Sequence, residues 1–213
     1  MRKLVVSSFV TLDGVMQAPG GPEEDGSGGF SHGGWSFAYF DEFLNDILLK
    51  QAEGAYDLLL GRKTYETFAK YFPLVEPPNP ISAAFNHARK YVVSNGSRTL
   101  DWGPSTRISG DVAEEITKLK RQEGPDLLVS GSGRLVQTLL KQDLVDELRL
   151  MIFPLTLGSG TRLFAEGTLP LNLRLVASAA SPSGVLVATY ARAGAIKSSS
   201  IAAAPASDGP SRN

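Results

Sequence analysis

Residues 56–68 read YDLLLGRKTYETF, and this stretch decides how the rest of the chain is interpreted. Its three consecutive leucines, residues 58–60, form a short apolar run that is typical of a strand buried on both faces of a sheet. Gly61 ends the run, and a helix is predicted to follow at once. The stretch therefore predicts a junction at which a buried strand passes directly into a helix.

Arg62 and Thr64 lie at this junction. The first N–H groups of a helix have no partner within the helix and carry the positive end of its dipole, so they favour anions. A guanidinium can also hold a phosphate through two parallel hydrogen bonds. We therefore expect a phosphate-bearing ligand here. The alternative is a capped helix whose Arg62 is simply solvated.

A second junction of the same kind follows at residues 126–134, DLLVSGSGR. Here Gly131, Ser132 and Gly133 separate a buried strand from an apolar helix, and glycine lets a backbone approach a pyrophosphate closely. The full dinucleotide-binding fingerprint is absent. A third candidate is the turn at Ser94 and Asn95 after the predicted strand KYVVS, which could hold a phosphate or could be an ordinary loop.

The composition excludes several classes of function. The chain has 213 residues, 42% of them apolar, a net charge of −1, no cysteine and two histidines. We therefore expect no metal site, no nucleic-acid partner and no thiol chemistry. No apolar run approaches the length of a membrane span or of a signal segment, which predicts no membrane partner and a cytoplasmic location.

Strands and helices alternate along most of the chain, beginning with a strand at residues 4–12. This order predicts a three-layer α/β fold, with a mostly parallel central sheet and helices on both faces. Two alternating stretches near the end, residues 171–177 and 185–190, predict a closing antiparallel hairpin. We expect one domain over residues 1–192 and a disordered tail over residues 193–213, where Ala, Ser, Gly and Pro dominate.

A helix is predicted over residues 41–53, and Asp41 lies at the edge of its apolar stripe. Asp41 is therefore the carboxylate on this helix that is best placed to face a pocket, or it is only the N-cap of the helix. The glycine-rich segment before it, residues 19–34, is either a lid, a binding loop or a mobile surface insertion.

Three motifs in this order resemble the dihydrofolate reductase fold: LLLGRKTYETF from Leu58, KYVVS from Lys90 and DLLVSGSGRLVQTLL from Asp126. A further run, DELRLMIFPLTLGSGTRLF over residues 146–164, is similar to the reductase domain of the bifunctional riboflavin-biosynthesis deaminase-reductase and to its stand-alone bacterial relatives. The chain carries no deaminase zinc motif.

The resemblance implies NADPH as cofactor. It places Arg62 and Thr64 at the NADPH phosphates, Ser94 and Asn95 beside the adenosine 2′-phosphate, and the segment Gly131, Ser132, Gly133 under the pyrophosphate and nicotinamide ribose. In the folate enzymes a carboxylate on the first helix supports protonation of the substrate. That makes Asp41 the candidate catalytic residue, with a pKa raised by partial burial.

By the same resemblance the substrate is a small pyrimidine- or pterin-like heterocycle, and the best match is a 5-amino-6-(5-phosphoribosylamino)uracil reductase-type activity. A non-catalytic nucleotide-binding module and a dihydrofolate reductase proper are the alternatives. A homodimer is also expected from the family likeness, through an apolar strand such as Leu148 to Phe153.

Overall fold

The computed structural model describes residues 1–196, and the last part of the predicted disordered tail, residues 197–213, lies outside the described residues. Within residues 1–196 the long elements, in chain order, are β1 (Leu4–Thr11), α1 (Glu42–Ala52), β2 (Tyr56–Gly61), α2 (Arg62–Tyr71), α3 (Pro80–His87), β3 (Lys90–Val93), β4 (Ser105–Ile108), α4 (Val112–Arg121), β5 (Asp126–Ser130), α5 (Gly133–Lys141), β6 (Glu147–Phe153), β7 (Leu173–Ala180) and β8 (Leu186–Arg192). Short 3-10 turns lie at Ser27–Gly29, Phe37–Tyr39 and Phe72–Leu74.

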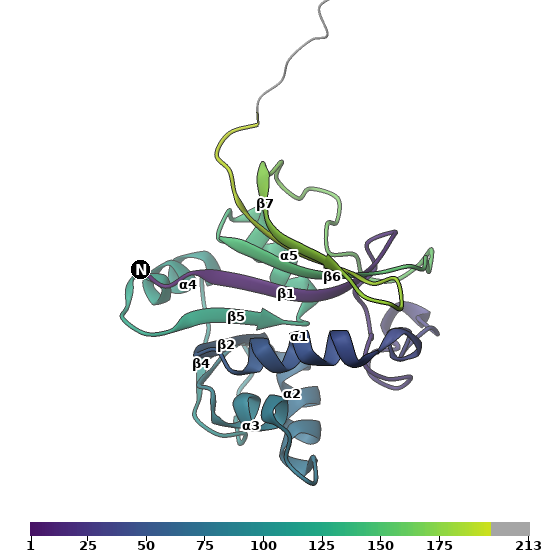
Figure 1. Cartoon of the computed structure of the whole chain (residues 1–213). Coiled ribbons are helices and arrows are strands. Elements are labelled where there is room, and N and C mark those ends of the chain that lie inside the picture. The colour runs from purple at the N-terminus through teal and green to yellow at the C-terminus, as the bar shows by residue number, and fades with distance from the viewer. Residues whose placement is uncertain (197–213) are drawn as a thin grey trace, which may run out of the picture.

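All eight strands form one sheet in the order β4-β3-β2-β5-β1-β6-β8-β7 (Figure 1). Strands β1 to β6 run parallel to one another, whereas β8 is antiparallel to both β6 and β7. The predicted fold class is confirmed, including the closing hairpin.

The two faces of the sheet carry different helices because side chains alternate along each strand. Leu59 of β2 packs in the cluster that contains the apolar residues of α4 and α5. Its neighbours Leu58 and Leu60 pack in the cluster formed with α2 and α3. A third cluster joins α1 to the ends of β1 and β6. The three leucines of the opening stretch are fully buried, as a strand covered on both faces requires.

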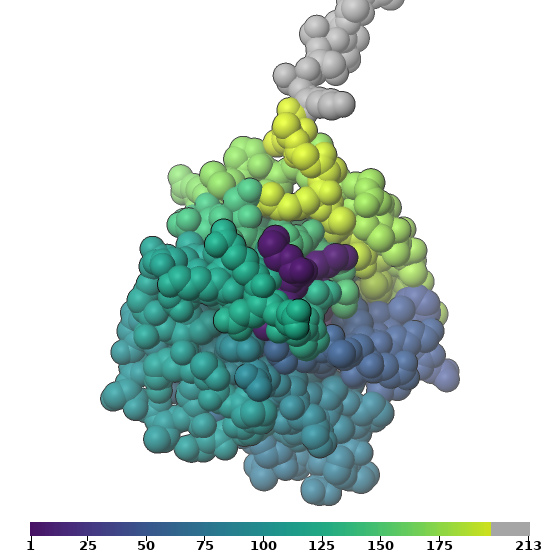
Figure 2. Space-filling view, turned by 90° about the vertical axis from the view of Figure 1, so that its left-hand side faces the viewer, coloured from purple at the N-terminus to yellow at the C-terminus, as the bar shows by residue number. Residues whose placement is uncertain are grey.

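Strand β1 lies in the centre of the sheet although it comes first in the sequence. Leu4 is opposite Leu127 of β5, and Val5 is opposite Glu147 of β6. Figure 2 views the edge at which β1 begins, where the purple N-terminus is flanked by teal segments on one side and by the yellow C-terminal strand on the other.

Helix α3 and strand β4 were not predicted from the sequence. Helix α3 follows the proline-rich segment 73–80, and its first residue is Pro80, which is tolerated at that position because the first N–H has no helical partner. Asn79 and Ser82 form a reciprocal capping box before it. Strand β4 has only four residues, too few for a visible alternation.

The predicted dimerisation through Leu148–Phe153 cannot occur by strand pairing, and a homodimer remains a prediction. These residues belong to β6, which is hydrogen-bonded to β1 on one side and to β8 on the other. Because both edges of β6 are occupied, it has no free backbone groups to offer a second chain.

The boundary between domain and tail at residue 192 remains a prediction, since β8 ends at Arg192 and only four residues beyond it are described. No helix within residues 1–196 is long and apolar enough to cross a membrane.

Candidate active site

The two strand-glycine-helix junctions lie side by side and hold each other through hydrogen bonds. Strands β2 and β5 are neighbours in the sheet, so their ends meet at the same edge. The Gly61 N–H donates to Ser132 Oγ at 3.0 Å, and the Ser132 N–H donates to Thr64 Oγ1, also at 3.0 Å. Thr64 and Ser132, which we expected at one ligand site, are therefore in direct contact.

The backbone at this contact requires glycine at Gly131. Its φ is +62°, and a Cβ built there would lie 3.1 Å from Thr64 Cγ2. Ser132 adopts a left-handed conformation as well, with φ at +57°, and it is buried. Gly133 is packed on its other side, where a Cβ would lie 3.0 Å from Thr161 Cγ2. The glycines thus allow close packing of three loops, and their predicted contact with a pyrophosphate remains a prediction.

Helices α2 and α5 leave this pair of junctions toward opposite faces of the sheet. In open α/β sheets the crevice at such a point, beyond the carboxyl ends of the strands, is where ligands bind. The N-terminal ends of both helices point to this crevice, and each brings unpaired first-turn N–H groups and the positive end of a helix dipole.

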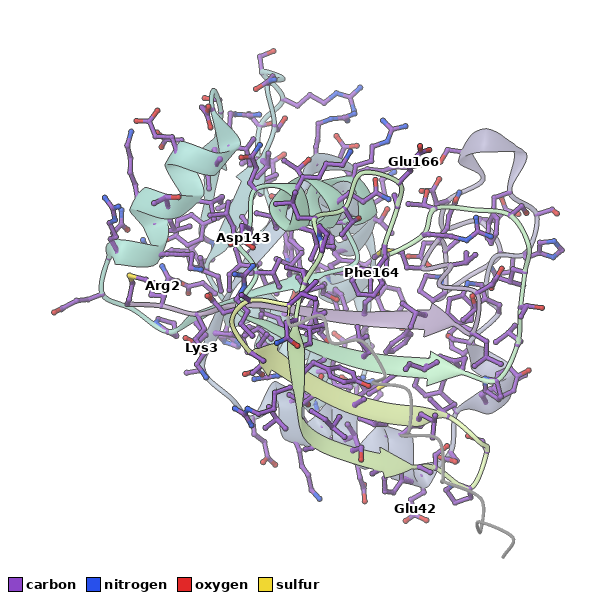
Figure 3. All side chains as sticks on the ribbon, turned by 90° about the horizontal axis from the view of Figure 1, so that it is seen from above. Arg2, Lys3, Glu42, Asp143, Phe164 and Glu166 are labelled. Atoms are coloured by element: carbon purple, nitrogen blue, oxygen red, sulfur yellow. The ribbon has the colours of Figure 1, made fainter. Side chains whose placement is uncertain are left out.

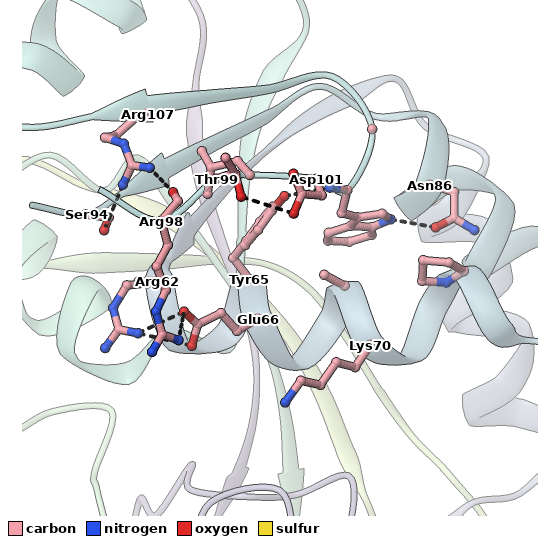
Figure 4. Close-up of a pocket in the computed structure, with 15 residues that line it drawn as sticks. Arg62, Tyr65, Glu66, Lys70, Asn86, Ser94, Arg98, Thr99, Asp101 and Arg107 are labelled. Atoms are coloured by element: carbon pink, nitrogen blue, oxygen red, sulfur yellow. Dashed lines mark hydrogen bonds and ion pairs between the residues drawn. The ribbon is translucent and has the colours of Figure 1, made fainter. Parts of the chain in front are cut away.

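A groove of about 750 Å³ runs from Arg62 along α2 (Figure 4). Four cations and two carboxylates line it, namely Arg62, Lys70, Arg98, Arg107, Glu66 and Asp101. The excess of positive charge is local, because the net charge of the whole chain is −1. A groove with this balance favours an anionic ligand.

The guanidinium groups in the groove are held in place by neighbours. Glu66 accepts two hydrogen bonds from Arg62, at 2.9 and 3.1 Å, and a third from Arg98 at 3.4 Å. Arg107 of β4 donates to Ser94 Oγ at 3.2 Å and to the carbonyl oxygen of Arg98 (Figure 4). Glu66 therefore offsets part of the positive charge of Arg62 and Arg98, whereas Arg107 is held by two neutral oxygens of the protein.

Ser94 lines the groove, its hydroxyl accepts the N–H of Gly96 at 3.2 Å, and its position beside a phosphate remains a prediction. Asn95 is exposed next to it and is not among the lining residues. Arg107 is the residue that sequence reasoning missed. It lies in the unpredicted strand β4, and a lone Arg in STRI gives no signal that it faces a groove.

The far end of the groove is aromatic. Trp102 is buried, its backbone N–H donates to Tyr65 Oη at 2.8 Å, and its indole N–H donates to Asn86 Oδ1 at 2.7 Å. The Lys90 ammonium lies 4.3 Å from the centre of the Trp102 ring. Burial lowers the pKa of Lys90 to about 8. The groove thus joins a cationic half to a half with an apolar, aromatic wall.

Asp41 is the N-cap of α1, which was one of the two roles that the sequence left open for it. Its Oδ1 accepts the Leu44 N–H at 2.9 Å, and its Oδ2 accepts the Ser183 N–H at 3.0 Å. These backbone donors, Leu44 first, lower the pKa of Asp41. The expected rise in pKa through burial was wrong, because hydrogen bonds to the charged form outweigh desolvation here.

The glycine-rich segment 19–34 is tied to the body of the protein at several points. The Gln17 side-chain amide donates to the carbonyl oxygens of Asp25 and Ser27, at 3.0 and 2.9 Å. Asp25 in turn forms an ion pair with Lys63, the second residue of α2. The segment therefore reaches the junction that begins the groove.

Within residues 1–196 no group of three or more His, Asp or Glu side chains could hold a metal ion.

The parallel sheet, the closing hairpin and the groove at the ends of β2, β3 and β4 define a dihydrofolate reductase-like α/β protein. The family model for the RibD C-terminal domain matches residues 2–187, so the chain belongs to that family. The resemblance inferred from the motifs is confirmed.

Among individual relatives, the uncharacterized protein YyaP of Bacillus subtilis is 30% identical over 196 residues, which cover 89% of this chain and 94% of YyaP. Solved structures of lower identity share the fold. A pyrimidine reductase-like protein from Corynebacterium diphtheriae is 14% identical, with a TM-score of 0.58 over 91% of this chain and 93% of its own. Dihydrofolate reductase from Enterococcus faecalis, complexed with NADP(H), is 17% identical, with a TM-score of 0.55 over 89% and 96%.

Proposed function

We propose that this protein is an NADPH-dependent reductase that transfers hydride to a small pyrimidine- or pterin-like heterocycle, with a 5-amino-6-(5-phosphoribosylamino)uracil reductase-type activity as the best match. The observation that carries the proposal is the cationic groove that begins at the interlocked junctions of β2 and β5. Membership of the RibD C-terminal domain family supports it.

The side chains present fit the cofactor. Arg62 and the first turns of α2 and α5 would hold its diphosphate, since both offer donors to anions. Ser94, Arg98 and Arg107 would surround a phosphate further along the groove, and the exposed Asn95, next to Ser94 in the chain, stays a candidate for the same phosphate. Leu100 and Pro73 would offer apolar surface to a base, since the aromatic rings of the groove are largely buried. When bound, NADPH would supply the hydride.

Asp41 remains our candidate for support of proton transfer. Its lowered pKa keeps it ionised at neutral pH, so it would orient a proton donor rather than give up a proton of its own. The variant Asp41→Asn tests this, because Asn caps helices as well as Asp does and the fold is retained. We expect turnover to fall by about 10²-fold with little change in NADPH binding.

The matched control is Asp111→Asn, which replaces the N-cap of α4, where Asp111 Oδ1 accepts the Glu114 N–H at 3.0 Å. Both variants should unfold at similar denaturant concentrations. Equal turnover in Asp41→Asn and Asp111→Asn would mean that Asp41 only caps its helix. That result would favour a different acid, or a nucleotide-binding module without catalysis.

Cofactor binding is tested by titrating the protein with NADPH and NADH while following tryptophan fluorescence, since Trp102 lines the groove. We expect NADPH to bind more tightly than NADH, and Arg62→Ala to weaken NADPH binding by about tenfold through the loss of a charge-assisted hydrogen bond. Arg121→Ala is the control, because Arg121 is exposed at the end of α4 and outside the groove. If neither nucleotide binds the parent protein, the reductase proposal fails.

A further inference from the structure

The chain that follows β1 connects the starting points of the two helices at the junctions. A Cβ built at Gly133, the first residue of α5, would lie 3.5 Å from Met16 Sδ. Further along, Asp25 contacts Lys63, the second residue of α2. Figure 3 shows this chain in faint purple at the arrowhead end of β1. Residues 16–25 therefore pass from one helix start to the other, at the end of the sheet where we place the diphosphate.

The Lys63 ammonium is held by two side chains of the glycine-rich segment 19–34. It forms an ion pair with Asp25 and donates to Ser27 Oγ at 3.4 Å. Asp25 Oδ1 also accepts the Ser27 N–H at 3.0 Å. Burial alone would raise the pKa of Asp25, but hydrogen bonds from Lys63 and Ser27 outweigh it and lower that pKa. Asp25 is therefore a carboxylate at neutral pH, and it neutralises a cation at the start of α2.

This position of the Asp25 carboxylate is one that suits a bound anion. The start of a helix favours negative charge. Lys63 lies on α2 between Arg62, which lines the groove, and Thr64, whose hydroxyl binds the other junction. A diphosphate held by Arg62 and the two helix starts would come within reach of the Lys63 ammonium. Because two anions repel each other at close range, that diphosphate and Asp25 would exclude each other from Lys63.

The segment 19–34 is fixed at its base and loosely held at its tip. At the base, the Gly34 N–H donates to the Ala18 carbonyl oxygen at 2.8 Å, and the Phe30 side chain is buried. Residues 25–29, the tip, read DGSGG, and the last four of them are exposed. Glycine gives this tip the backbone freedom to leave α2 while the base keeps its contacts.

We propose that the Asp25 carboxylate and a phosphate group of the ligand compete for the Lys63 ammonium. When the phosphate takes Lys63, Asp25 is released and the tip moves away from α2. The ion pair is partly exposed, with 58% of the Lys63 side chain accessible, so a diphosphate, with its greater negative charge, replaces the carboxylate at a small cost in affinity. The proposal rests on the proposed function, because it takes the ligand to be a phosphate-bearing cofactor such as NADPH.

The test is a titration with NADPH, at constant ionic strength, of the parent protein, Asp25→Asn, Lys63→Gln and the double variant. We expect Asp25→Asn to tighten NADPH binding by about threefold to fivefold, since no ion pair has to be broken. In the Lys63→Gln background the same change should alter the affinity by less than about twofold. Unchanged NADPH binding by Asp25→Asn would overturn the proposal. Weaker binding would also overturn it, because the segment would then assist the ligand.

Glu23→Gln is the matched control for charge. Glu23 is exposed in the same segment and forms no ion pair within residues 1–196. Its replacement removes the same negative charge and should change the NADPH affinity by less than about twofold. Equal tightening by Glu23→Gln and Asp25→Asn would assign the effect to long-range charge and overturn a competition for Lys63.

Hydrogen exchange follows the tip itself. In the absence of nucleotide, the amides of residues 25–29 should exchange faster in Asp25→Asn than in the parent protein, because the tip has lost its contact with α2. Addition of NADPH to the parent protein should also speed the exchange of these amides. Slower exchange with NADPH would show that the segment closes on the ligand, and that result would contradict the release of Asp25.

Failure of the competition and failure of the proposed function give different results. NADPH binding by the parent protein without a gain in Asp25→Asn would keep the cofactor and remove the competition. If the parent protein binds neither NADPH nor NADH, the proposed function fails, and inorganic pyrophosphate becomes the probe. Tighter binding of pyrophosphate to Asp25→Asn than to the parent protein would then support the competition, whereas equal binding or no binding would overturn it.

Discussion

The β2–α2 and β5–α5 junctions have the same sequence pattern, a buried strand followed by glycine and a helix, but they contribute different properties to the site. The β2 junction exposes Arg62 and Lys63 at the start of its helix. The β5 junction places Gly131 and Ser132 in left-handed conformations and buries Ser132 against Thr64. One junction therefore supplies charge, and the other brings its backbone close to the Thr64 side chain of the first junction. A pattern of residue types alone does not distinguish these two uses.

The largest loss of stability should come from adding a side chain at Gly131, where the backbone lies close to Thr64. Gly131→Val forces a β-branched residue to a φ of +62° and into Thr64, so we expect the free energy of unfolding to fall by about 3 kcal/mol. Gly28→Val is the control, because Gly28 has a φ of +71° but no atom within 4 Å of its Cβ position. Urea unfolding measures both. Equal losses would mean that backbone strain alone, and not the contact with Thr64, requires glycine.

Loss of the Thr64 hydroxyl, which connects the two junctions, should lower stability less than a side chain at Gly131 does. Thr64→Val keeps the shape but leaves the part-buried Ser132 N–H without a partner, which should cost about 1–2 kcal/mol of stability. Thr67→Val removes a hydroxyl of the same helix that only binds the Lys63 carbonyl oxygen, and it should cost less than about 0.5 kcal/mol. Similar stabilities of the two variants would show that the junctions do not depend on this hydrogen bond.

Arg107 tests the contribution of positive charge to the groove. Its replacement should weaken nucleotide binding and leave the free energy of unfolding nearly unchanged. We expect Arg107→Gln to weaken NADPH binding by about tenfold and NADH binding by less than about twofold, because only NADPH carries the additional phosphate. Arg121→Gln is the matched control. Fluorescence titration with both nucleotides gives the ratio, and equal losses for the two nucleotides would place Arg107 away from that phosphate.

The smallest effect on stability is expected just beyond the end of β1. There a carboxylate, rather than a glycine or a hydroxyl, holds the chain that follows the strand. Asp13 accepts hydrogen bonds from Thr11 and from the Leu157 and Gly158 N–H groups, and it pairs with Arg162. The Thr11 hydroxyl is the main group that lowers the pKa of Asp13, which is about 2. Because the folded pKa lies below the ordinary value of 3.8, the carboxylate stabilises the fold above about pH 4, and this stability is lost as the pH falls toward 2.

We therefore expect the free energy of unfolding of Asp13→Asn to depend less steeply on pH between 4 and 2 than that of the parent protein. At neutral pH the variant should lose less than about 1 kcal/mol. Urea titrations at constant ionic strength across this range provide the measurement. Identical slopes in the two proteins would show that other carboxylates account for the acid sensitivity.

The fold was predictable because the information is local. Runs such as residues 58–60 and 127–129 identify buried strands by themselves, and the glycines mark where the strands end. The pKa of Asp41 was predicted in the wrong direction, because its largest cause, the Leu44 N–H, belongs to the N-cap alternative, and a further donor, the Ser183 N–H, lies 142 residues along the chain. Arg107 was missed for a related reason. Its strand is too short to be recognised, and only the folded loop places it against Ser94.

The central place of β1 has a consequence for how the chain is made. The Lys3 N–H binds Asp126, 123 residues later, and the Leu4 N–H binds Asp146, 142 residues later. At ordinary synthesis rates the first strand leaves the ribosome roughly 6–25 s before β5 exists to pair with it. During that interval the apolar residues of β1 lack both of the strands between which they are buried in the folded protein.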